Sequence, residues 1–477
     1  MDKKFISKKR KQRREKAPLV DALEQFSKHP SYQFHIPGHT GGKFTSKKFK
    51  NLMGKALTID TTDEFDGLGT LHPATGPVRK AELSAARAFG AKRTLFLVNG
   101  STAGNLAVAM GMTKKGQKVI VNRNCHRSIL TGLIISGAEV LWAIPETLSD
   151  WGIWGEITPQ QIEKMLKEND DVALVWITNP TYEGVVSDIK SIAAVCKKYE
   201  VPLVVDEAHG CLWKFCDELP TSALDAGADI VINSLHKTGG SMSQSSMLHI
   251  SKNSKFNPDA IEKALKLVHT TSPSMLLMAS LDAARANLES DNGQAQIKMA
   301  VDNAKYLRKH IDGMKKISHL ISTSEKFKTD VTKVFIKAEG LTGTQLEKIL
   351  ETDFRIEVES SSDIGILILC NPGNTKNDIK YLIKALDKID KTDYSKIYKP
   401  ERRKHMPLCI PVTKMSMRNA YYSEKENIKT RDAIGRICAE IVAECPPGIS
   451  ILMPGEVIRE EHLPYLFNYK TLDVVKG

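Results

Sequence analysis

The sequence predicts an α/β fold in which helices cover a mainly parallel sheet, followed by a smaller α/β unit. Two observations support this prediction. Short, near-continuous apolar runs recur between about residues 94 and 234, and helix-like stretches separate them. After about Arg285 the pattern changes to a long lysine-rich helical region and then to shorter strands around 331–337 and 364–369, which predicts the second unit.

Several runs in the first half are typical of buried strands, because their apolar residues are continuous rather than alternating. These runs are 94–99, 119–122, 172–178, 203–206 and 230–233. Between them, the amphipathic segments 159–167 and 189–198 predict helices. Strands that alternate with helices favour a parallel sheet joined by right-handed crossovers, and such sheets bind ligands at the carboxyl ends of their strands.

We expect four parts along the chain: a basic N-terminal arm over 1–30, a large ligand-binding domain over 31–285, a small α/β domain over 286–400 and a C-terminal region over 401–477. Nine lysines and arginines lie among the first sixteen residues. The arm is predicted to be solvated or to pack on a dimer partner. Nucleic-acid binding is the disfavoured alternative, because no nucleic-acid-binding motif accompanies the charge.

Composition limits the class of protein. With 477 residues, of which 41% are hydrophobic, the chain can bury a core in two or more units. No apolar run approaches the roughly 20 residues of a membrane span, and no apolar stretch or cleavage site follows the basic N-terminus, so we expect a cytoplasmic protein with no membrane partner. The eight cysteines show no CxxC spacing, which predicts reduced thiols and no metal site.

A lysine-containing segment after the run 230–233 is the strongest indication of chemistry. Residues 233–246 read Asn-Ser-Leu-His-Lys-Thr-Gly-Gly-Ser-Met-Ser-Gln-Ser-Ser. A lysine amine just past a strand end can attack a carbonyl carbon, while neighbouring hydroxyls and backbone N–H groups bind a phosphate. Lys237 is therefore predicted to be a functional lysine rather than one of many surface cations.

Three further segments place polar residues at strand ends. Asp206 ends an apolar run, where a carboxylate is costly unless it meets a cation such as a protonated pyridine nitrogen; a helix cap or a pair with Lys or Arg is the alternative. Ser101 and Thr102 follow a glycine turn at a helix start, a suitable place for a phosphate. His126 could stack on a pyridine ring or be a structural histidine. Together these segments indicate a pyridoxal-phosphate (PLP) enzyme.

The order of these motifs resembles the Orn/Lys/Arg decarboxylase family, which consists of PLP-dependent enzymes of fold type I. The cofactor-attachment pattern is similar at Ser234, His236, Lys237, Gln244, Ser245 and Ser246. The segments 34–39, 206–210, 269–274, 446–449 and 453–456 are similar too, so the resemblance extends from about residue 17 onward. The chain lacks the receiver-like wing domain of larger members, and it resembles the short type.

The resemblance implies a role for each motif. Lys237 would hold PLP as a Schiff base, Asp206 would pair with the pyridine nitrogen and His126 would stack on the ring. The residues around the phosphate would be Ser101, Thr102, Ser234 and His236. His209 is a candidate for contact with the phenolic oxygen of the cofactor or with the substrate carboxylate. The segments 34–39 and 63–76 would contribute to a site shared across a homodimer or a larger homo-oligomer.

The implied activity is α-decarboxylation of arginine, lysine or ornithine to agmatine, cadaverine or putrescine and CO2, with arginine slightly favoured. Two departures from the family pattern leave the substrate open: 67–72 reads Gly-Leu-Gly-Thr-Leu-His, and 445–450 reads Cys-Pro-Pro-Gly-Ile-Ser. The acidic candidates for binding the distal cation of the substrate are Asp63, Glu64, Asp66 and Glu456.

Two alternatives stay open from the sequence. One is another PLP-dependent reaction on the same fold, such as that of an aminotransferase or a different lyase, because the attachment site specifies the cofactor more firmly than the bond that breaks. The other is a non-catalytic regulatory or nucleic-acid-binding protein.

Overall fold

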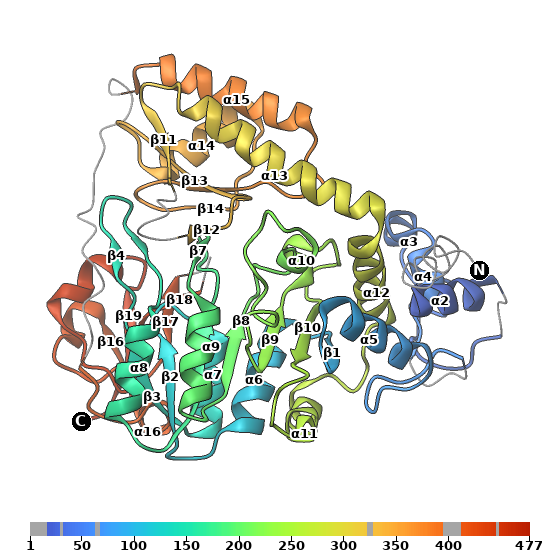
Figure 1. Cartoon of the computed structure of the whole chain (residues 1–477), viewed down its shortest axis with the longest axis horizontal. Helices are drawn as coiled ribbons and strands as arrows, with labels where there is room; N and C mark the ends of the chain where they lie inside the picture. The colour runs from blue at the N-terminus through green and yellow to red at the C-terminus, as the bar shows by residue number, and fades with distance from the viewer. Residues whose placement is uncertain (1–16, 29–31, 63–66, 322–327, 395–411, 445–447) are drawn as a thin grey trace. The chain divides into compact units, whose positions relative to one another are not determined.

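The computed structural model describes residues 17–28, 32–62, 67–321, 328–394, 412–444 and 448–477 (Figure 1). The described chain divides into two compact units. The first comprises Met1–Met112, Pro202–Asp217 and Thr221–Ala295, and the second comprises Thr113–Val201, Glu218–Pro220 and Gln296–Gly477. Among the described helices, none has the combination of length and apolar character that a membrane span requires.

Within the described residues, the main sheet has seven strands in the order β1-β10-β9-β8-β6-β2-β3. The pairs β8–β9, β2–β6 and β2–β3 are parallel, whereas β1–β10 and β10–β9 are antiparallel. The strands are β1 (Arg93–Leu97), β2 (Lys118–Asn122), β3 (Glu139–Ala143), β6 (Val172–Thr178), β8 (Leu203–Asp206), β9 (Ile230–Asn233) and β10 (Ser246–Ile250).

The five predicted strands of this sheet are confirmed to within about two residues, and the mainly parallel α/β class is confirmed as well. The predicted helices are found as α8 (Pro159–Glu168) and α9 (Ile189–Lys198). Strands β3 and β10 were not predicted. The first is a continuous apolar run over 140–143 that follows the exposed Glu139, so its pattern was present but not used, whereas the second mixes Ser246 and His249 with apolar residues.

In the first unit, close helix packing depends on two glycines. Helix α6 (Gly100–Met112) contacts strands β1, β9 and β10 and also helix α11 (Pro258–Val268). A Cβ atom on Gly104 would lie 2.8 Å from Leu97 Cδ1, and one on Gly111 would lie 3.0 Å from the Ala260 carbonyl oxygen. Larger residues at either position would push α6 away from its neighbours, and α6 begins at the candidate site.

The N-terminal helices also belong to the first unit. Helix α2 (Pro18–Lys28) contacts α5 (Gly76–Phe89) and α12 (Met275–Glu289) and buries Leu19 and Leu23 (Figure 1). The remaining helices are α3 (Lys47–Met53), α4 (Ala56–Ile59) and the short α10 (Leu235–Thr238). Residues 1–16 of the predicted basic arm lie outside the described residues.

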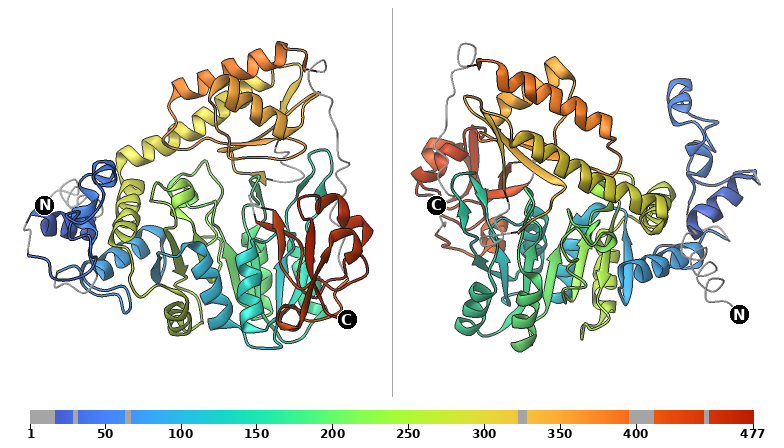
Figure 2. Two further views of the ribbon diagram at one scale, coloured as in Figure 1. Left: turned by 180° about the vertical axis from the view of Figure 1, so that it is seen from behind. Right: turned by 45° about the horizontal axis from the view of Figure 1, so that its top comes forward.

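In the described part of the second unit, four strands form an antiparallel sheet in the order β11-β13-β15-β14 (Figures 1 and 2). They are β11 (Ile317–His319), β13 (Lys333–Ala338), β14 (Ser360–Ser361) and β15 (Ile366–Leu369). A shared apolar core joins this sheet to α13 (Asp291–Ile311), α14 (Gly343–Phe354) and α15 (Lys376–Lys391). This is the smaller α/β arrangement that the sequence predicts.

The rest of the second unit includes the C-terminal region, which has an apolar core of its own. Strand β16 (Lys425–Lys429) pairs with β19 (Thr471–Val475), and β17 (Val442–Glu444) pairs with β18 (Ile449–Leu452). Helix α16 (Met417–Tyr422) contacts α7 (Arg127–Ser136). The predicted domain limits near residues 30, 285 and 400 stay predictions.

A buried ion pair on α12 provides a test of this packing. Asp282 and Arg285 are fully buried and 2.5 Å apart, and Asp282 also accepts a hydrogen bond from the Leu19 backbone N–H of α2 at 2.8 Å. We expect Asp282→Ala to lower the free energy of unfolding by about 3 kcal/mol, because it leaves a buried guanidinium without one of its carboxylates. Urea unfolding followed by circular dichroism measures this loss.

The matched control is Lys164→Ala, which removes a surface ion pair with Glu168 in which the lysine side chain is 74% exposed. It should change stability little. A loss for Asp282→Ala no larger than that of the control would contradict this account of α12.

Candidate active site

The candidate site lies at the carboxyl ends of β8 and β9 in the first unit. These strands are parallel, and Asp206 at the end of β8 is in register with Ile232 of β9. The chain leaves β9 at Asn233 and enters α10, which carries Lys237. Because parallel strands end at one edge of a sheet, Asp206 and the segment around Lys237 emerge at the same edge, as the sequence predicts.

Lys237 has a histidine as its neighbour. Its Nζ lies 2.8 Å from Nε2 of His209, which follows β8. The lysine is half-buried and His209 is buried. The pair can share one proton, because a neutral imidazole nitrogen can accept a hydrogen bond from the amine. This contact differs from the two that were predicted for His209, which were with the phenolic oxygen of the cofactor and with the substrate carboxylate.

Asp206 is a buried carboxylate with neutral neighbours. It is 2% exposed, and its oxygens accept hydrogen bonds from the Asn105 side-chain amide at 3.1 Å and from the Ala208 backbone N–H at 3.2 Å. Among the described residues, the structure gives it no cationic partner. The alternative in which Asp206 pairs with Lys or Arg therefore finds no support, and a buried negative charge of this kind favours a cation supplied by a ligand.

A cluster of hydroxyl groups lies at the start of α6. Ser101 Oγ is 2.7 Å from Ser234 Oγ and donates a hydrogen bond to Ser246 Oγ at 3.1 Å. The chain turns into α6 at Gly100, whose φ of +71° favours glycine and whose N–H donates to the Gln244 carbonyl oxygen. Hydroxyls beside the free N–H groups of a helix N-terminus form an anion site that fits a phosphate.

The two other predicted phosphate contacts differ in their surroundings. Thr102, in the first turn of α6, is exposed. His236 is half-buried, and its Nδ1 lies 2.8 Å from the Ser245 carbonyl oxygen, so Nδ1 carries a proton and donates. Burial lowers the pKa of His236, and the neighbouring positive charge of Lys237 lowers it further. A phosphate dianion beside Nε2 would act in the opposite direction and favour the charged ring.

His126, the predicted ring-stacking residue, belongs to the second unit. It follows β2 and caps α7, where its Nδ1 accepts a hydrogen bond from the Ser128 backbone N–H at 3.2 Å and lies 2.7 Å from Ser128 Oγ. Because Nδ1 accepts, a neutral ring carries its proton on Nε2. The ring is half-buried.

The structure corrects one candidate for the distal cation of the substrate. Glu456 is 2% exposed and forms an ion pair with Arg123 at 3.2 Å, so it is already neutralised by a residue of the chain itself. Asp63, Glu64 and Asp66 lie outside the described residues, and their assignment stays a prediction.

Three supporting residues, Asn105, Glu207 and Gln244, have contacts that the sequence did not predict. Asn105 contacts Asp206, and the Gln244 side-chain amide donates to the Val98 carbonyl oxygen at 2.7 Å. Glu207 accepts hydrogen bonds from the Ala223 N–H at 2.6 Å and the Asn233 side chain at 3.0 Å. The sequence did single out the segments that contain two of them, 206–210 for Glu207 and 233–246 for Gln244.

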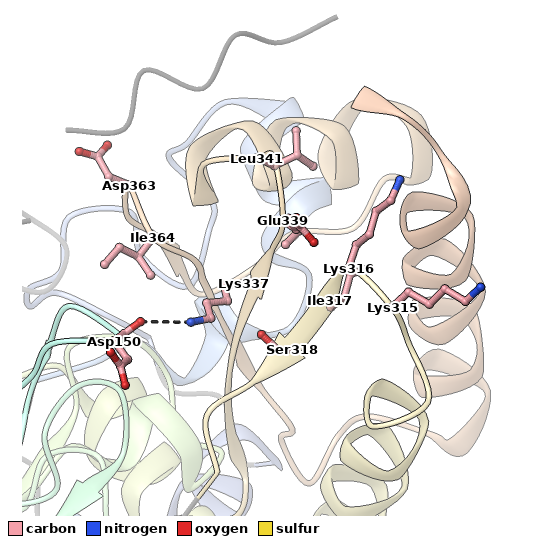
Figure 3. Close-up of a pocket in the computed structure, with 11 residues that line it drawn as sticks. Asp150, Lys315, Lys316, Ile317, Ser318, Lys337, Glu339, Leu341, Asp363 and Ile364 are labelled. Carbon is pink, nitrogen blue, oxygen red and sulfur yellow. Dashed lines mark hydrogen bonds between the residues drawn. The ribbon is translucent and has the colours of Figure 1, made fainter. Parts of the chain in front are cut away.

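A separate cavity of about 450 Å³ lies in the second unit (Figure 3). Its charged lining is of mixed sign and comprises Asp150, Lys315, Lys316, Lys337, Glu339 and Asp363. Lys337 donates to the Asp150 carbonyl oxygen at 3.1 Å, while Lys315 and Lys316 extend away from that contact. None of the predicted site residues lines this cavity.

Comparisons with known proteins agree with these motifs. Residues 17–335 match the model of the Orn/Lys/Arg decarboxylase major domain, and 401–473 match that of the C-terminal domain. The arginine decarboxylase of Bacillus subtilis (strain 168) is 38% identical over 466 residues, which cover 96% of this chain and 94% of that protein. Lysine decarboxylase LdcA of Pseudomonas aeruginosa is 31% identical over 319 residues, covering 61% of this chain and 42% of that protein.

Among solved structures, the lysine decarboxylase LdcF of Francisella novicida superposes with a TM-score of 0.83. The match covers 96% of this chain and 81% of that chain at 20% sequence identity, which shows a shared fold.

Glu207 provides a test of the site by pH. Burial raises its pKa to about 8, although the Asn233 and Ala223 donors act to lower it. The folded protein therefore holds a proton that the unfolded chain loses above about pH 4.5, and this contribution to stability declines as the pH rises toward 8. We expect the free energy of unfolding to fall by up to about 1.4 kcal/mol per pH unit from this group between pH 5 and 8.

Glu207→Gln should flatten that slope, because the amide does not titrate, whatever its effect on absolute stability. Urea unfolding at four pH values measures both proteins. Equal slopes for the two would show that Glu207 is ionised in the folded protein across this range.

Proposed function

We propose that this chain, which belongs to the Orn/Lys/Arg decarboxylase family, holds PLP on Lys237 and removes the α-carboxylate of a basic amino acid as CO2. The observation that carries the assignment of Lys237 is its position beside His209 at the strand edge where the buried Asp206 also ends. A lysine and an aspartate with purely structural roles would not need to emerge together at one edge of the sheet, with a histidine beside the lysine.

The residues present fit the cofactor. PLP has an aldehyde, a phosphate and a pyridine nitrogen, and the first unit offers a half-buried amine, an anion site and a buried carboxylate without a cation among the described residues. The hydroxyls of Ser101, Ser234 and Ser246 would hold the phosphate. When bound, PLP accepts the electron pair that remains at Cα when CO2 leaves.

Asp206 would keep a proton on the pyridine nitrogen. Its carboxylate is fixed by Asn105 and Ala208, so it needs no reorganisation to meet a positive charge. Burial removes this carboxylate from water at a cost in free energy, and a cation beside it would offset that cost. The pairing would therefore favour the protonated, charged form of the pyridine at neutral pH.

Lys237 and His209 would carry out the proton transfers of the reaction. The Lys237 amine must be neutral to attack an aldehyde, and His209 Nε2 at 2.8 Å is placed to accept its hydrogen bond and to hold the proton. The same amine would be the group that delivers a proton to Cα after CO2 has left.

Arginine is the substrate we favour. Four curated relatives that are 36% to 38% identical over most of the chain are named arginine decarboxylase, whereas the relatives named lysine decarboxylase are more distant. Because Glu456 is paired with Arg123, the acidic candidates for the distal guanidinium that stay predictions are Asp63, Glu64 and Asp66.

A homodimer is part of this proposal. The segment 32–52 exposes large apolar side chains, with Tyr32 93%, Phe34 97%, Phe44 84% and Leu52 80% exposed. Isolated exposed apolar residues are common, but a series of this kind in one segment is typical of a surface that a partner covers. A cytoplasmic location stays a prediction.

The proposed function is tested by absorbance and by product. The purified protein with PLP should show the visible band of covalently held cofactor, Lys237→Ala should lack it, and the control Lys252→Ala at an exposed position should keep it. Asp206→Asn should lose roughly 100-fold or more in turnover, because it removes one electrostatic partner of the transition state.

Amine formation from arginine, lysine and ornithine, supplied separately, identifies the substrate. We expect agmatine to form fastest. A visible band without any amine would point to another PLP-dependent reaction, and the absence of a band at saturating PLP would refute the assignment of Lys237.

The homodimer has its own test in Phe34→Asp. A charge at a buried aromatic contact should weaken association, because such residues often contribute about 2 kcal/mol or more to binding. Sedimentation across a dilution series should give a dimer for the wild type and a larger fraction of monomer for the variant. Phe467→Asp, at a side chain 54% exposed in the second unit, is the control. A wild-type monomer at all concentrations would contradict the proposal.

A further inference from the structure

Gln244, in the turn before β10, has an unusual backbone conformation. Its φ is +77°, in the left-handed region that side chains other than glycine, asparagine and aspartate rarely adopt. Glycine avoids this strain because it has no Cβ atom. A strained residue of this kind persists where its surroundings fix it, and such residues are concentrated at functional sites. The contacts of Gln244 therefore indicate what the strain serves.

Strand pairing brings Gln244 beside the turn that enters α6. In the antiparallel pair β1–β10, Leu97 is in register with Ser246, so the residues just before β10 lie next to those just after β1. The side-chain amide of Gln244 donates to the Val98 carbonyl oxygen at 2.7 Å. Its backbone carbonyl oxygen accepts a hydrogen bond from the Gly100 N–H at 2.8 Å. Gln244 therefore holds this turn at two points, one with its side chain and one with its backbone.

The turn held in this way places the hydroxyl group of Ser101. Ser101 Oγ lies 2.7 Å from Ser234 Oγ and donates to Ser246 Oγ at 3.1 Å. Both of these partners are buried, and they belong to other elements, since Ser234 caps α10 and Ser246 begins β10. Ser101 meets both only while the turn 98–101 keeps its conformation. The contacts of Gln244 therefore help to determine where the three hydroxyls of the anion site converge.

The residue after Gln244 orients a second group of the candidate phosphate site. The Ser245 carbonyl oxygen lies 2.8 Å from Nδ1 of His236 and accepts its hydrogen bond, which leaves Nε2 for a ligand. Ser245 is fully buried, and its Oγ lies 2.6 Å from oxygen atoms of residues 241 and 242. In the segment 244–246, each residue thus contacts a different part of the candidate phosphate site.

Stability alone does not account for a glutamine at position 244. Glycine would adopt the same φ without strain. The residue is exposed, so water can take the place of its amide at a small net cost. Hydrogen bonds to an anion, in contrast, depend closely on distance and angle, and they are stronger than those between neutral groups. A fixed turn therefore matters more for binding a phosphate than for folding.

We infer that Gln244 is a positioning residue for the phosphate of the cofactor, which fixes the turn 98–101 so that Ser101 and the first N–H groups of α6 converge on one anion. The inference deepens the proposed function and rests on the phosphate site proposed there. Gln244 acts through the turn and does not touch the reacting atoms. Its loss should weaken the hold on the phosphate and leave the attachment of the aldehyde to Lys237 unaffected.

The test compares binding of PLP with binding of pyridoxal, which has the same ring and aldehyde but lacks the phosphate. Titrations followed by the visible absorbance band give both affinities. Gln244→Leu removes the amide and keeps a side chain of similar size. We expect it to bind PLP about tenfold more weakly, the effect of one misplaced hydrogen bond to a charged group, and to bind pyridoxal as the wild type does.

The matched control is Gln161→Leu. The Gln161 side-chain amide also donates to a backbone carbonyl oxygen, that of Ile144 at 2.9 Å, but it belongs to α8 of the second unit. This variant loses the same type of hydrogen bond, and we expect it to keep the wild-type ratio of PLP to pyridoxal affinity.

A second variant separates positioning from folding. Gln244→Gly removes the amide and also the strain of the left-handed conformation, so its midpoint of urea unfolding should stay close to that of the wild type. We expect its ratio of PLP to pyridoxal affinity to fall as it does in Gln244→Leu. A lower ratio in a protein of unchanged stability is not the result of partial unfolding.

The possible results separate the inference from the proposed function. A wild-type affinity ratio in both Gln244 variants, or equal losses of PLP and pyridoxal affinity, would overturn the inference and leave the proposed function intact. A ratio that falls equally in Gln161→Leu would overturn it too, because the effect would not be specific to the turn. Failure of the wild type to bind PLP would refute the proposed function itself, and the inference with it.

Discussion

The carboxylate of Asp206, buried at the end of a parallel strand, is the constraint on which the candidate site depends. Its described neighbours are an amide and a backbone N–H, which solvate the charge but do not neutralise it. A fold that retains such a group carries a desolvation cost that a bound cation would offset. A ligand that binds the folded chain and not the unfolded chain also stabilises it by mass action. Binding of a cation beside Asp206 would therefore be coupled to the stability of the first unit through one side chain.

The next residue shows how strand geometry separates two acids. Asp206 and Glu207 are adjacent, yet Asp206 contacts Asn105 of α6 while Glu207 contacts Ala223 and Asn233. Side chains that alternate along an extended backbone meet different surroundings, so one acid can serve a ligand while the other ties β8 to β9. The raised pKa of Glu207, caused by burial, fits a structural role in which the group is protonated near neutral pH.

The sequence predicted those features that local patterns encode. Continuous apolar runs located β2, β6, β8 and β9, and the lysine motif placed Lys237 just after the end of β9. Strand β10 was not predicted because Ser246 and His249 interrupt its apolar residues, whereas β3 was overlooked although 140–143 is continuously apolar. The partners of Asp206 and Glu456 could not be predicted, since Asn105 is 101 residues from Asp206 and Arg123 is 333 residues from Glu456. From sequence, Glu456 is one exposed acid among many, and only its burial against Arg123 shows that its charge is already used.

That pairing changes how the C-terminal region is understood. The region has an apolar core of its own, and its Glu456 is buried beside Arg123 of the loop after β2. The loop takes backbone partners from Gly448 and Ile449 and side-chain partners from Met453 and Glu456. The loop 123–127 and residues 448–456 are therefore joined at several points, and each limits the conformations open to the other. A segment more than 300 residues from Arg123 in the sequence thus holds the loop that follows β2.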